Sequence, residues 1–384
     1  MDSIIELTKK LCPNGVNFYK LEELLDYEQP TKYIVKSTEY NDEFNTPVLT
    51  AGQSFILGFT NEEQGHYLAT PENPVIIFDD FTTGFHWVDF EFKVKSSAMK
   101  MLRPKNKSFN FKYVYHAMKS LNYQPGGHQR HWISIYSQLE IPLPPLEIQN
   151  EIVSFLDNFN SLSNLLNKEL EKRKVQLEYY TEKLLDFDNN VQVKSLREIA
   201  DFRNGKGHEK NIVDDGKFIV VNSKFISSEG AVCKFSNEQI CPLFVDDILM
   251  VMSDLPNGKA LAKCFLVEKN DTYTLNQRIG AFHVKDKTSI STKFLFYSLN
   301  RNPQLLAYDN GSDQTNLRKD DILNISIKLP CIETQKQIVS ILEYFNKLCN
   351  LESGIPAEIQ KRNLQYEYYL YKLFDFKKSN KEVY

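Results

Sequence analysis

The sequence predicts an α+β fold in which two similar globular domains are separated by two long antiparallel helices, as an internal duplication with a pseudo-twofold axis. Three observations predict this architecture. A helix-forming stretch occurs twice, a segment rich in short strands precedes each copy, and 384 residues are enough for two domains with a core each.

The repeat is clearest in the helix-forming stretch. "IPLPPLEIQNEIVSFLDNFN" (141–160) returns as "IKLPCIETQKQIVSILEYFN" (327–346), with eleven of twenty positions identical. "KRKVQLEYYTEKLLDF" (172–187) matches "KRNLQYEYYLYKLFDF" (361–376), and the offset between the copies rises from 186 to 189 residues. The second copy therefore contains a three-residue insertion between these two matches.

Apolar residues recur at a spacing of three and four along residues 147–187, which predicts an amphipathic helix of roughly 60 Å. Pro144 and Pro145 mark its start, and "DFDNN" (186–190) marks its end. A second rod is expected over 333–376, where Gly354 and Pro356 should break or kink it. Because a single domain cannot cover so long an apolar seam, the two rods should pair with each other.

The segments before the rods read as α+β domains. Strands are predicted at 73–80, 88–95, 217–222 and 278–285, and short helices at 112–122 and 293–300. A further short helix at Ser3–Cys12 should pack near the C-terminal end of the second rod. The predicted division is a first recognition domain at 1–140, a first spacer helix at 141–189, a second recognition domain at 190–326 and a second spacer helix at 327–384.

Composition excludes several classes of protein. Apolar residues make up 42% and charged residues 25% of the chain, and no apolar run approaches the ~20 residues of a membrane span. The N-terminus lacks the apolar core of a secretory signal, so a cytoplasmic protein is expected. The six cysteines contain no CxxC pair, and most of them are expected to be small core residues.

Catalytic motifs are missing from the sequence, so no catalytic residue, metal or cofactor is predicted for the chain itself. The phosphate-binding loop GxxxxGK[ST] is absent, and His128 and His131 lack an accompanying acid. Asp79 or Asp80 followed by Glu91-Phe92-Lys93 imitates a metal-dependent nuclease motif. We interpret that pattern as a solvated strand face, because the second half keeps Asp246-Asp247 without an ExK after it.

The repeated motifs resemble those of a known family. Each half has a G-x-x-Q loop ("GGHQRH", 126–131; "GSDQTN", 311–316), then I-x-L-P-x-x-E-x-Q-x-x-I-V, then a long helix ending in KR…EYY..KL. Over essentially the whole chain this order is similar to the specificity subunit of type I restriction-modification systems. The resemblance implies two target recognition domains that bind double-stranded DNA with an unread spacer. It also implies docking of two modification subunits, which carry the methyl-transfer chemistry, with restriction subunits as optional members. A single chain would then act as an internal pseudo-dimer.

Net charge is −4, which argues against strong DNA binding by the chain alone, because Lys and Arg supply most affinity for phosphates. Two local runs are nevertheless basic, at 95–107 and 202–210. We expect DNA contacts from Lys100, Arg103, Lys105, Lys107, His128, Gln129 and Arg130 in the first domain and from Lys206, Lys210, Asn276, Gln277, Arg278, Gln314 and Thr315 in the second.

Two other functions remain open at the level of sequence. Paired rods would also suit a non-catalytic coiled-coil scaffold or adaptor whose domains bind other proteins. An intrinsic nuclease would require the Asp80 and Glu91-Phe92-Lys93 side chains to converge on a metal.

Overall fold

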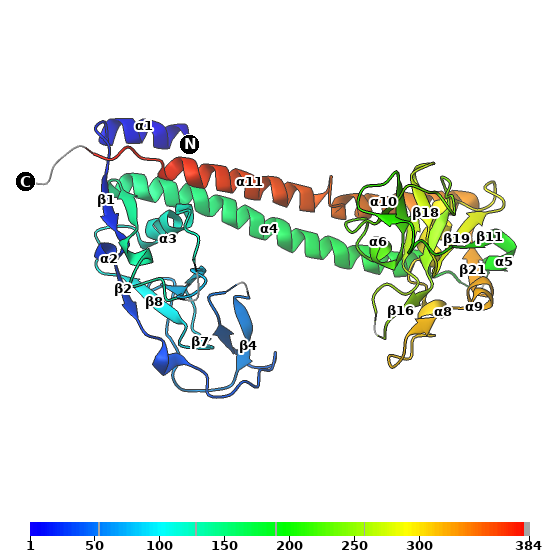
Figure 1. Ribbon diagram of the computed structural model, residues 1–384, viewed down its shortest axis with the longest axis horizontal. Coiled ribbons are helices and arrows are strands. Elements are labelled where there is room, and N and C mark those ends of the chain that lie inside the picture. The colour runs from blue at the N-terminus through cyan, green and yellow to red at the C-terminus, as the bar shows by residue number, and fades with distance from the viewer. Residues whose placement is uncertain (53, 127–128, 189, 257, 380–384) are drawn as a thin grey trace, which may run out of the picture. The chain divides into compact units, whose positions relative to one another are not determined.

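The computed structural model describes residues 1–52, 54–126, 129–188, 190–256 and 258–379. It consists of two compact units, Met1–Leu166 with Glu358–Tyr384, and Asn167–Ala357 (Figure 1). Helix α4 (Leu146–Leu185) and helix α11 (Ile355–Phe374) contribute to both. Among the described residues, no helix is long and apolar enough to cross a membrane.

The remaining elements of the first unit are α1 (Asp2–Leu11), β1 (Asn17–Lys20), α2 (Leu21–Leu24), β2 (Leu25–Glu28), η1 (Thr31–Tyr33), β3 (Thr46–Leu49), β4 (Ile56–Thr60), β5 (Val75–Asp79), β6 (Phe85–Val88), β7 (Lys93–Val94), β8 (Met99–Pro104), α3 (Phe111–Ser120), η2 (Tyr136–Gln138) and β9 (Glu140–Leu143). Those of the second are β10 (Gln192–Ser195), α5 (Leu196–Ile199), β11 (Ala200–Asn204), β12 (Ile212–Val213), β13 (Phe218–Val221), α6 (Ser223–Ser227), β14 (Phe235–Ser236), β15 (Ile248–Val251), β16 (Ser253–Asp254), β17 (Cys264–Leu266), β18 (Tyr273–Leu275), β19 (Ile279–Val284), α7 (Thr292–Leu299), α8 (Pro303–Leu306), β20 (Thr315–Asn316), α9 (Lys319–Leu323), β21 (Ser326–Leu329) and α10 (Ile332–Cys349).

Each unit has a four-stranded antiparallel sheet and a further sheet, which is β4-β3-β7 in the first unit and the four-stranded β12-β14-β13-β18 in the second. The two antiparallel sheets have equivalent strand orders. The order is β2-β8-β5-β6 in the first unit and β11-β19-β15-β17 in the second. All neighbouring strands in both sheets are antiparallel. A two-stranded pair, β1 with β9 or β10 with β21, joins each globule to the helix that follows. The fold therefore repeats even where the sequences of the globules diverge.

Both faces of the first sheet are covered, which explains the continuous apolar run "VIIF" in β5. Ile76 and Phe78 join a cluster with α3 and the long helices, whereas Val75 and Ile77 join a second cluster on the other face. Strands that are buried on both faces lose the usual alternation of polar and apolar residues.

One predicted strand, 88–95, is wrong as a single element. Strand β6 ends at Val88, and β7 begins only at Lys93, where it pairs with β3 in a different sheet. Between them the backbone of Phe92 bonds to Tyr67, with N···O distances of 2.8 and 3.1 Å. A contact distant in sequence thus divides a segment that looks continuous.

The glutamine of the repeated P-x-x-E-x-Q motif joins each long helix to its globule. Gln149 is buried; its Oε1 accepts a bond from Asn110 N at 2.8 Å and its Nε2 donates to Pro144 O at 2.7 Å. Gln335 repeats this arrangement: Oε1 accepts from Ser291 N at 2.9 Å, and Nε2 donates to Pro330 O at 2.9 Å. Asn110 and Ser291 are the N-caps of α3 and α7, so each glutamine couples the start of one helix to the start of another.

The long helices pair in the antiparallel sense, as predicted. In the first unit Phe155 of α4 contacts Tyr369 of α11 at 5.2 Å between ring centroids, and Ser163 bonds to Asn363 at 3.1 Å. Residue numbers rise along one helix and fall along the other. In the second unit Tyr180 of α4 stacks on Phe345 of α10 with centroids 5.2 Å apart.

The break in the second rod is confirmed. Helix α10 ends at Cys349, and α11 begins at Ile355 with Pro356 in its first turn. The Asn350 carboxamide oxygen accepts bonds from the backbone N–H groups of Glu352 (2.9 Å) and Ser353 (3.0 Å). A Cβ at Gly354 would lie 2.4 Å from Leu348 O, so this turn requires glycine.

A buried histidine connects three helices of the first unit. His116 of α3 has no exposed surface; its Nε2 lies 3.0 Å from Asp157 Oδ1 on α4, and its Nδ1 lies 3.3 Å from Tyr366 Oη on α11. Lys112 Nζ also reaches Asp157, at 3.1 Å. Burial lowers the pKa of His116, although the hydrogen bond and charge of Asp157 act in the opposite direction.

Helix α1 lies where a short N-terminal helix is expected. Its Ile4 and Leu7 belong to the same apolar cluster as Leu370 and Leu373 of α11. The chain after α1 pairs with the end of the sequence through Val16 and Lys378.

Candidate nucleic-acid interface

In the second unit, two of the loops expected to bind DNA are held together by their backbones. Gly205 N donates to Ile279 O and Lys206 N to Leu275 O, both at 3.1 Å. A Cβ at Gly205 would lie 1.9 Å from Asn276 O, so only glycine permits this approach. The side chains of Lys206 and Arg278 are exposed on the two loops.

Some side chains in these loops form hydrogen bonds with each other. Gln277 Nε2 donates to the carboxylate of Glu209, and Arg278 has a positive φ of 66°. Lys210 is exposed beyond this pair, whereas Asn276 is half-buried and its Oδ1 is enclosed without a hydrogen-bond donor. The loops therefore carry three exposed cations, Lys206, Lys210 and Arg278, and the exposed Gln277.

The second G-x-x-Q loop lies beside the same region. Gln314 is exposed, and its Nε2 donates to Ser253 Oγ at 2.7 Å. Thr315 belongs to β20, which pairs with β16, and only 8% of its surface is exposed. Its hydroxyl lies 3.4 Å from Asp309 Oδ1. Thr315 is thus almost wholly buried, which disfavours its predicted role as a DNA contact.

In the first unit, the basic run includes β8, and cations at the end of this strand pair with acids of the neighbouring strand β2. Arg103 of β8 bonds to Glu28 of β2, and Lys105 Nζ lies 3.9 Å from Asp26 Oδ1. Burial alone would raise the pKa of Glu28, but hydrogen bonds from Lys32 and Tyr33 and the charge of Arg103 lower it overall. Arg103, Lys105 and Lys107 are all exposed.

Lys100 does not lie at the surface, which corrects its prediction as a DNA contact. Its side chain is fully buried, with Nζ 3.2 Å from Asp80 Oδ2. The alignment is poor for a hydrogen bond, so charge attraction carries this contact. An unpaired buried carboxylate would be costly, and Lys100 compensates Asp80 in the core.

The first G-x-x-Q loop is anchored by the same aspartate. His131 N donates to Asp80 O at 2.8 Å and Trp132 N to Asp80 Oδ1 at 2.9 Å. Gln129 and Arg130, just before these anchors, are exposed. His128 lies outside the described residues. Sequence reasoning missed the anchoring role of Asp80, although an acid at the end of a buried strand is a signal that could have found it.

The nuclease-like residues do not converge on a common point. Asp80 pairs with Lys100, Glu91 with His66, and Lys93 with Glu62 at 3.1 Å. Our interpretation of a solvated strand face is also wrong for Asp80 and Lys93, which are buried. Among the residues that the structure describes, no group of three or more His, Cys, Asp or Glu side chains could hold a metal ion.

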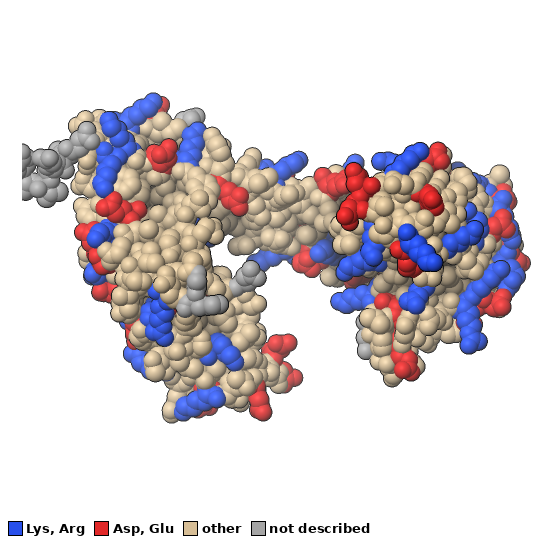
Figure 2. All heavy atoms as spheres, in the orientation of Figure 1, with Lys and Arg blue, Asp and Glu red and all other residues tan. Residues whose placement is uncertain are grey.

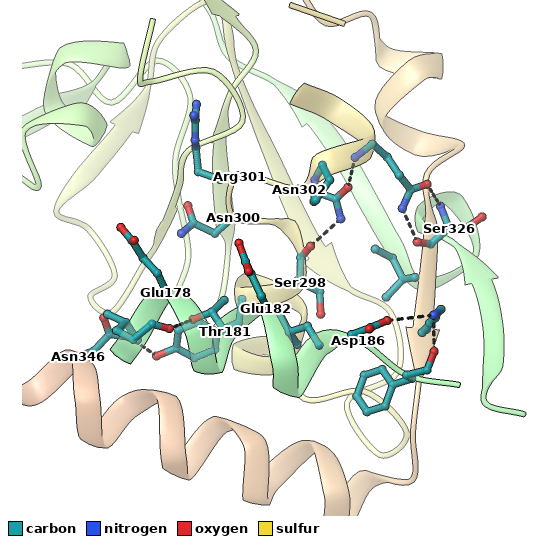
Figure 3. Close-up of a pocket in the computed structure, with 18 residues that line it drawn as sticks. Glu178, Thr181, Glu182, Asp186, Ser298, Asn300, Arg301, Asn302, Ser326 and Asn346 are labelled. Carbon is teal, nitrogen blue, oxygen red and sulfur yellow. Dashed lines mark hydrogen bonds and ion pairs between the residues drawn. The ribbon is translucent and has the colours of Figure 1, made fainter. Parts of the chain in front are cut away.

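A groove of about 880 Å³ lies where α4 meets the second globule (Figure 3). Glu178 and Glu182 project into it from α4, and Ser298 and Asn300 line the facing wall at the end of α7. Asp186, the first residue after α4, is 3.8 Å from Lys328. Figure 2 shows acidic and basic side chains mixed over the visible face of this unit.

Comparisons with known proteins agree with this architecture. A model of the type I restriction modification DNA specificity domain matches residues 13–173 and 188–361. The EcoR124I/EcoR124II specificity subunit of Escherichia coli is 38% identical over 98% of both chains. A putative specificity subunit of Haemophilus influenzae is 25% identical over 96% of this chain and 98% of its own length.

A solved specificity subunit from M. genitalium superposes with a TM-score of 0.58 at 17% identity, covering 94% of this chain and 97% of that one. This structural similarity supports the fold, and the match to the family model shows the family. The chain belongs to the specificity subunits of type I restriction-modification systems, and it is the non-catalytic DNA specificity subunit of such a system.

Proposed function

We propose that this chain reads a bipartite DNA sequence, with each globule recognising one half-site and the long helices setting the unread spacer. The observation that carries the proposal is the equivalent strand order of the antiparallel sheets β2-β8-β5-β6 and β11-β19-β15-β17, combined with loops whose sequences differ. Equivalent sheets would hold the recognition loops of each domain in the same way, and loops of different sequence would recognise different bases. The proposed division remains recognition domains at 1–140 and 190–326 and spacer helices at 141–189 and 327–384.

The proposed DNA contacts are the exposed members of the predicted set. Cations would hold phosphates, and amides would reach base edges. They are Arg103, Lys105, Lys107, Gln129 and Arg130 in the first domain and Lys206, Lys210, Gln277, Arg278 and Gln314 in the second. His128 and the half-buried Asn276 stay as predictions. The proposed set leaves out Lys100 and Thr315, because both side chains are buried.

The proposed partners are two modification subunits that dock on the helices, with restriction subunits joining them. Two pairs of exposed apolar residues support duplicated docking: Val175 with Tyr179, and their repeat equivalents Leu364 with Tyr368. These four residues are 63%, 54%, 60% and 58% exposed. Each pair is spaced i, i+4 and so lies on one helix face. We also assign the acidic groove to protein contact, because its carboxylates disfavour DNA phosphates.

We place the complex in the cytoplasm, where host DNA is accessible to its methyltransferase. The test is to express this chain with its modification subunits in a host that lacks them and to map the newly methylated adenines. Two short conserved blocks separated by a spacer of constant length are expected. A single continuous motif would contradict the proposal, and so would methylation that is independent of this chain.

A further inference from the structure

Both units hold an exposed apolar side chain at the start of a tight turn with the pattern Asp-(Phe or Leu)-x-x-Gly. These are Phe81 in "DFTTG" (80–84) and Leu255 in "DLPNG" (254–258). Phe81 is 37% exposed and Leu255 is 68% exposed. Single exposed apolar residues are common on protein surfaces, so the surroundings of these two decide their interpretation.

A carboxylate braces each turn. In the first unit, Asp79 Oδ1 accepts bonds from Phe81 N and Thr82 N, both at 2.8 Å. In the second, Asp254 Oδ1 accepts from Leu255 N at 2.9 Å, and its Oδ2 accepts from Ala260 N at 2.7 Å. The apolar side chains are therefore held on pre-organised backbone, which lowers the entropy lost when they make a contact.

Close packing surrounds the glycine of each turn. A Cβ at Gly84 would lie 2.7 Å from the backbone oxygen of Ala51, which cannot move aside, and a Cβ at Gly258 would lie 2.1 Å from Asp254 Oδ2, so that this carboxylate would have to shift. Two turns of different sequence and different bracing thus each carry an exposed apolar residue directly after an aspartate.

Each turn also lies against the G-x-x-Q loop of its own unit. Asp80 accepts bonds from the backbone N–H groups of His131 and Trp132, two and three residues beyond Gln129. Asp254 pairs with Thr315 in the β16–β20 ladder, and Gln314 bonds to the neighbouring Ser253. Arg278 is close to the second turn, because its carbonyl oxygen accepts a bond from Met252 N at 3.0 Å. Each turn is therefore bonded, through residues next to its apolar side chain, to a loop that carries exposed amides and cations.

We propose that Phe81 and Leu255 are specificity-determining residues, each contacting a thymine methyl group in its own half-site. This inference rests on the proposed function. Base edges in the major groove offer hydrogen-bond donors and acceptors and one apolar group, the thymine C5-methyl. An apolar residue among amides and cations adds sequence information by contacting that group. One isolated apolar residue is too small a patch for docking of a protein.

The test uses the complete complex with its modification subunits. Selection from random DNA first defines both half-sites of the wild type and then those of the Phe81→Ala and Leu255→Ala variants. Each variant is expected to lose its preference for one thymine in one half-site and to keep the other half-site unchanged. The unchanged half-site is an internal control for folding and assembly. Leu68→Ala removes an even more exposed leucine (71%) outside the turns and should alter neither half-site.

Uracil, which lacks the methyl group, then replaces the identified thymine. The wild type should lose roughly 3- to 10-fold in affinity, as expected for one methyl contact, whereas the matching alanine variant should bind both bases equally.

Two results would overturn the inference while leaving the proposed function intact. One is a wild type that selects a bipartite site while both alanine variants keep all its preferences. The other is relaxation without a uracil effect, which would indicate an apolar wedge between base pairs. If the wild type itself selected no bipartite site, the proposed function would fail first.

Discussion

At the scale of single residues, Gln149 and Gln335 are the clearest link between sequence and structure. Their identity in both copies has a physical cause: each carboxamide satisfies a backbone N–H and a backbone carbonyl that would otherwise lack partners. Glu147 and Glu333 repeat just as faithfully, but they are exposed in the first turns of α4 and α10. The glutamines and the glutamates are thus repeated equally in sequence, but only the glutamines are buried.

We expect Gln149→Ala or Gln335→Ala to lower the free energy of unfolding by roughly 2–3 kcal/mol, because each leaves buried backbone groups unpaired. Glu147→Ala and Glu333→Ala are the matched controls and should cost about 0.3–1 kcal/mol through the helix dipole alone. Urea unfolding of the full chain measures both. Equal losses for the glutamine and glutamate variants would contradict the explanation.

The His116 network predicts a dependence of stability on pH. Asp157 and Tyr366 bond to His116, and Lys112, Lys119 and Tyr115 of its own helix face it. Because burial lowers the pKa of His116 below its ordinary 6.5, the unfolded chain binds this proton more tightly. The contribution of neutral His116 to the free energy of unfolding is therefore fully present above pH 6.5 and is lost as the pH falls below that value. The carboxyl of Asp157, whose pKa is also lowered, adds its own loss only below 3.8.

His116→Asn should unfold more easily than the wild type at neutral pH and lose less stability between about pH 7.5 and 5.5. Tyr297 occupies the equivalent position of α7 and bonds to Asn346 at 2.8 Å, so Tyr297→Phe is the control. It should keep the wild-type pH slope. Thermal unfolding across this pH range measures both variants, and an unchanged slope in His116→Asn would refute the assignment.

Which basic residues face the solvent could not be predicted from the sequence. Lys100 lies in the run 95–107, where neighbouring Arg103, Lys105 and Lys107 are exposed. Alternation along β8 gives no guidance, because Met101 and Leu102 join clusters on opposite faces of the sheet. Only the position of Asp80, distant in sequence, explains why a lysine is enclosed at position 100.

At the scale of elements, local pattern predicted helices better than strands. The predicted helix over 147–187 is observed as Leu146–Leu185, because a 3/4 apolar spacing and two prolines are local signals. The segment 88–95 failed as a single strand, since its partners Tyr67 and β3 are distant in sequence. The helix break could be predicted because Gly354 and Pro356 disfavour helix by themselves.

The break itself can be tested at Gly354. Gly354→Ala would place a Cβ 2.4 Å from Leu348 O and should destabilise the chain by roughly 1–3 kcal/mol. Gly126→Ala is the matched control, because a Cβ there meets no atom within 4 Å, and its effect should be near zero or slightly stabilising. Thermal unfolding measures the difference, and equal melting temperatures would show that the turn can rearrange.

At the scale of the whole molecule, the duplication explains why one chain can read two half-sites. Sequence similarity between the copies is strong in the helices and weak in the globules, whereas the four-stranded antiparallel sheets β2-β8-β5-β6 and β11-β19-β15-β17 have equivalent strand orders. The scaffold is constrained by packing, and the loops are free to differ. The two-domain architecture could therefore be predicted from the repeat, but the contents of each recognition surface could not.

If the helices set the spacing of the half-sites, inserting one heptad into both, after Leu170 in α4 and after Ile359 in α11, should lengthen the unread spacer. Seven helical residues add about 10 Å, which corresponds to roughly three base pairs of DNA. A heptad keeps the apolar seam facing its partner, whereas inserting one or two residues would rotate the seam into solvent and damage folding.

Three base pairs also rotate one half-site by roughly 100° relative to the other, so affinity will fall unless the DNA twists or the helices supercoil to compensate. Affinity is therefore the wrong measurement, and the preferred spacing in a selection from random-spacer DNA is the right one. Both half-site sequences should persist while the spacer grows. If a folded, active complex kept the original spacer, the modification subunits and not these helices would set the distance between the half-sites.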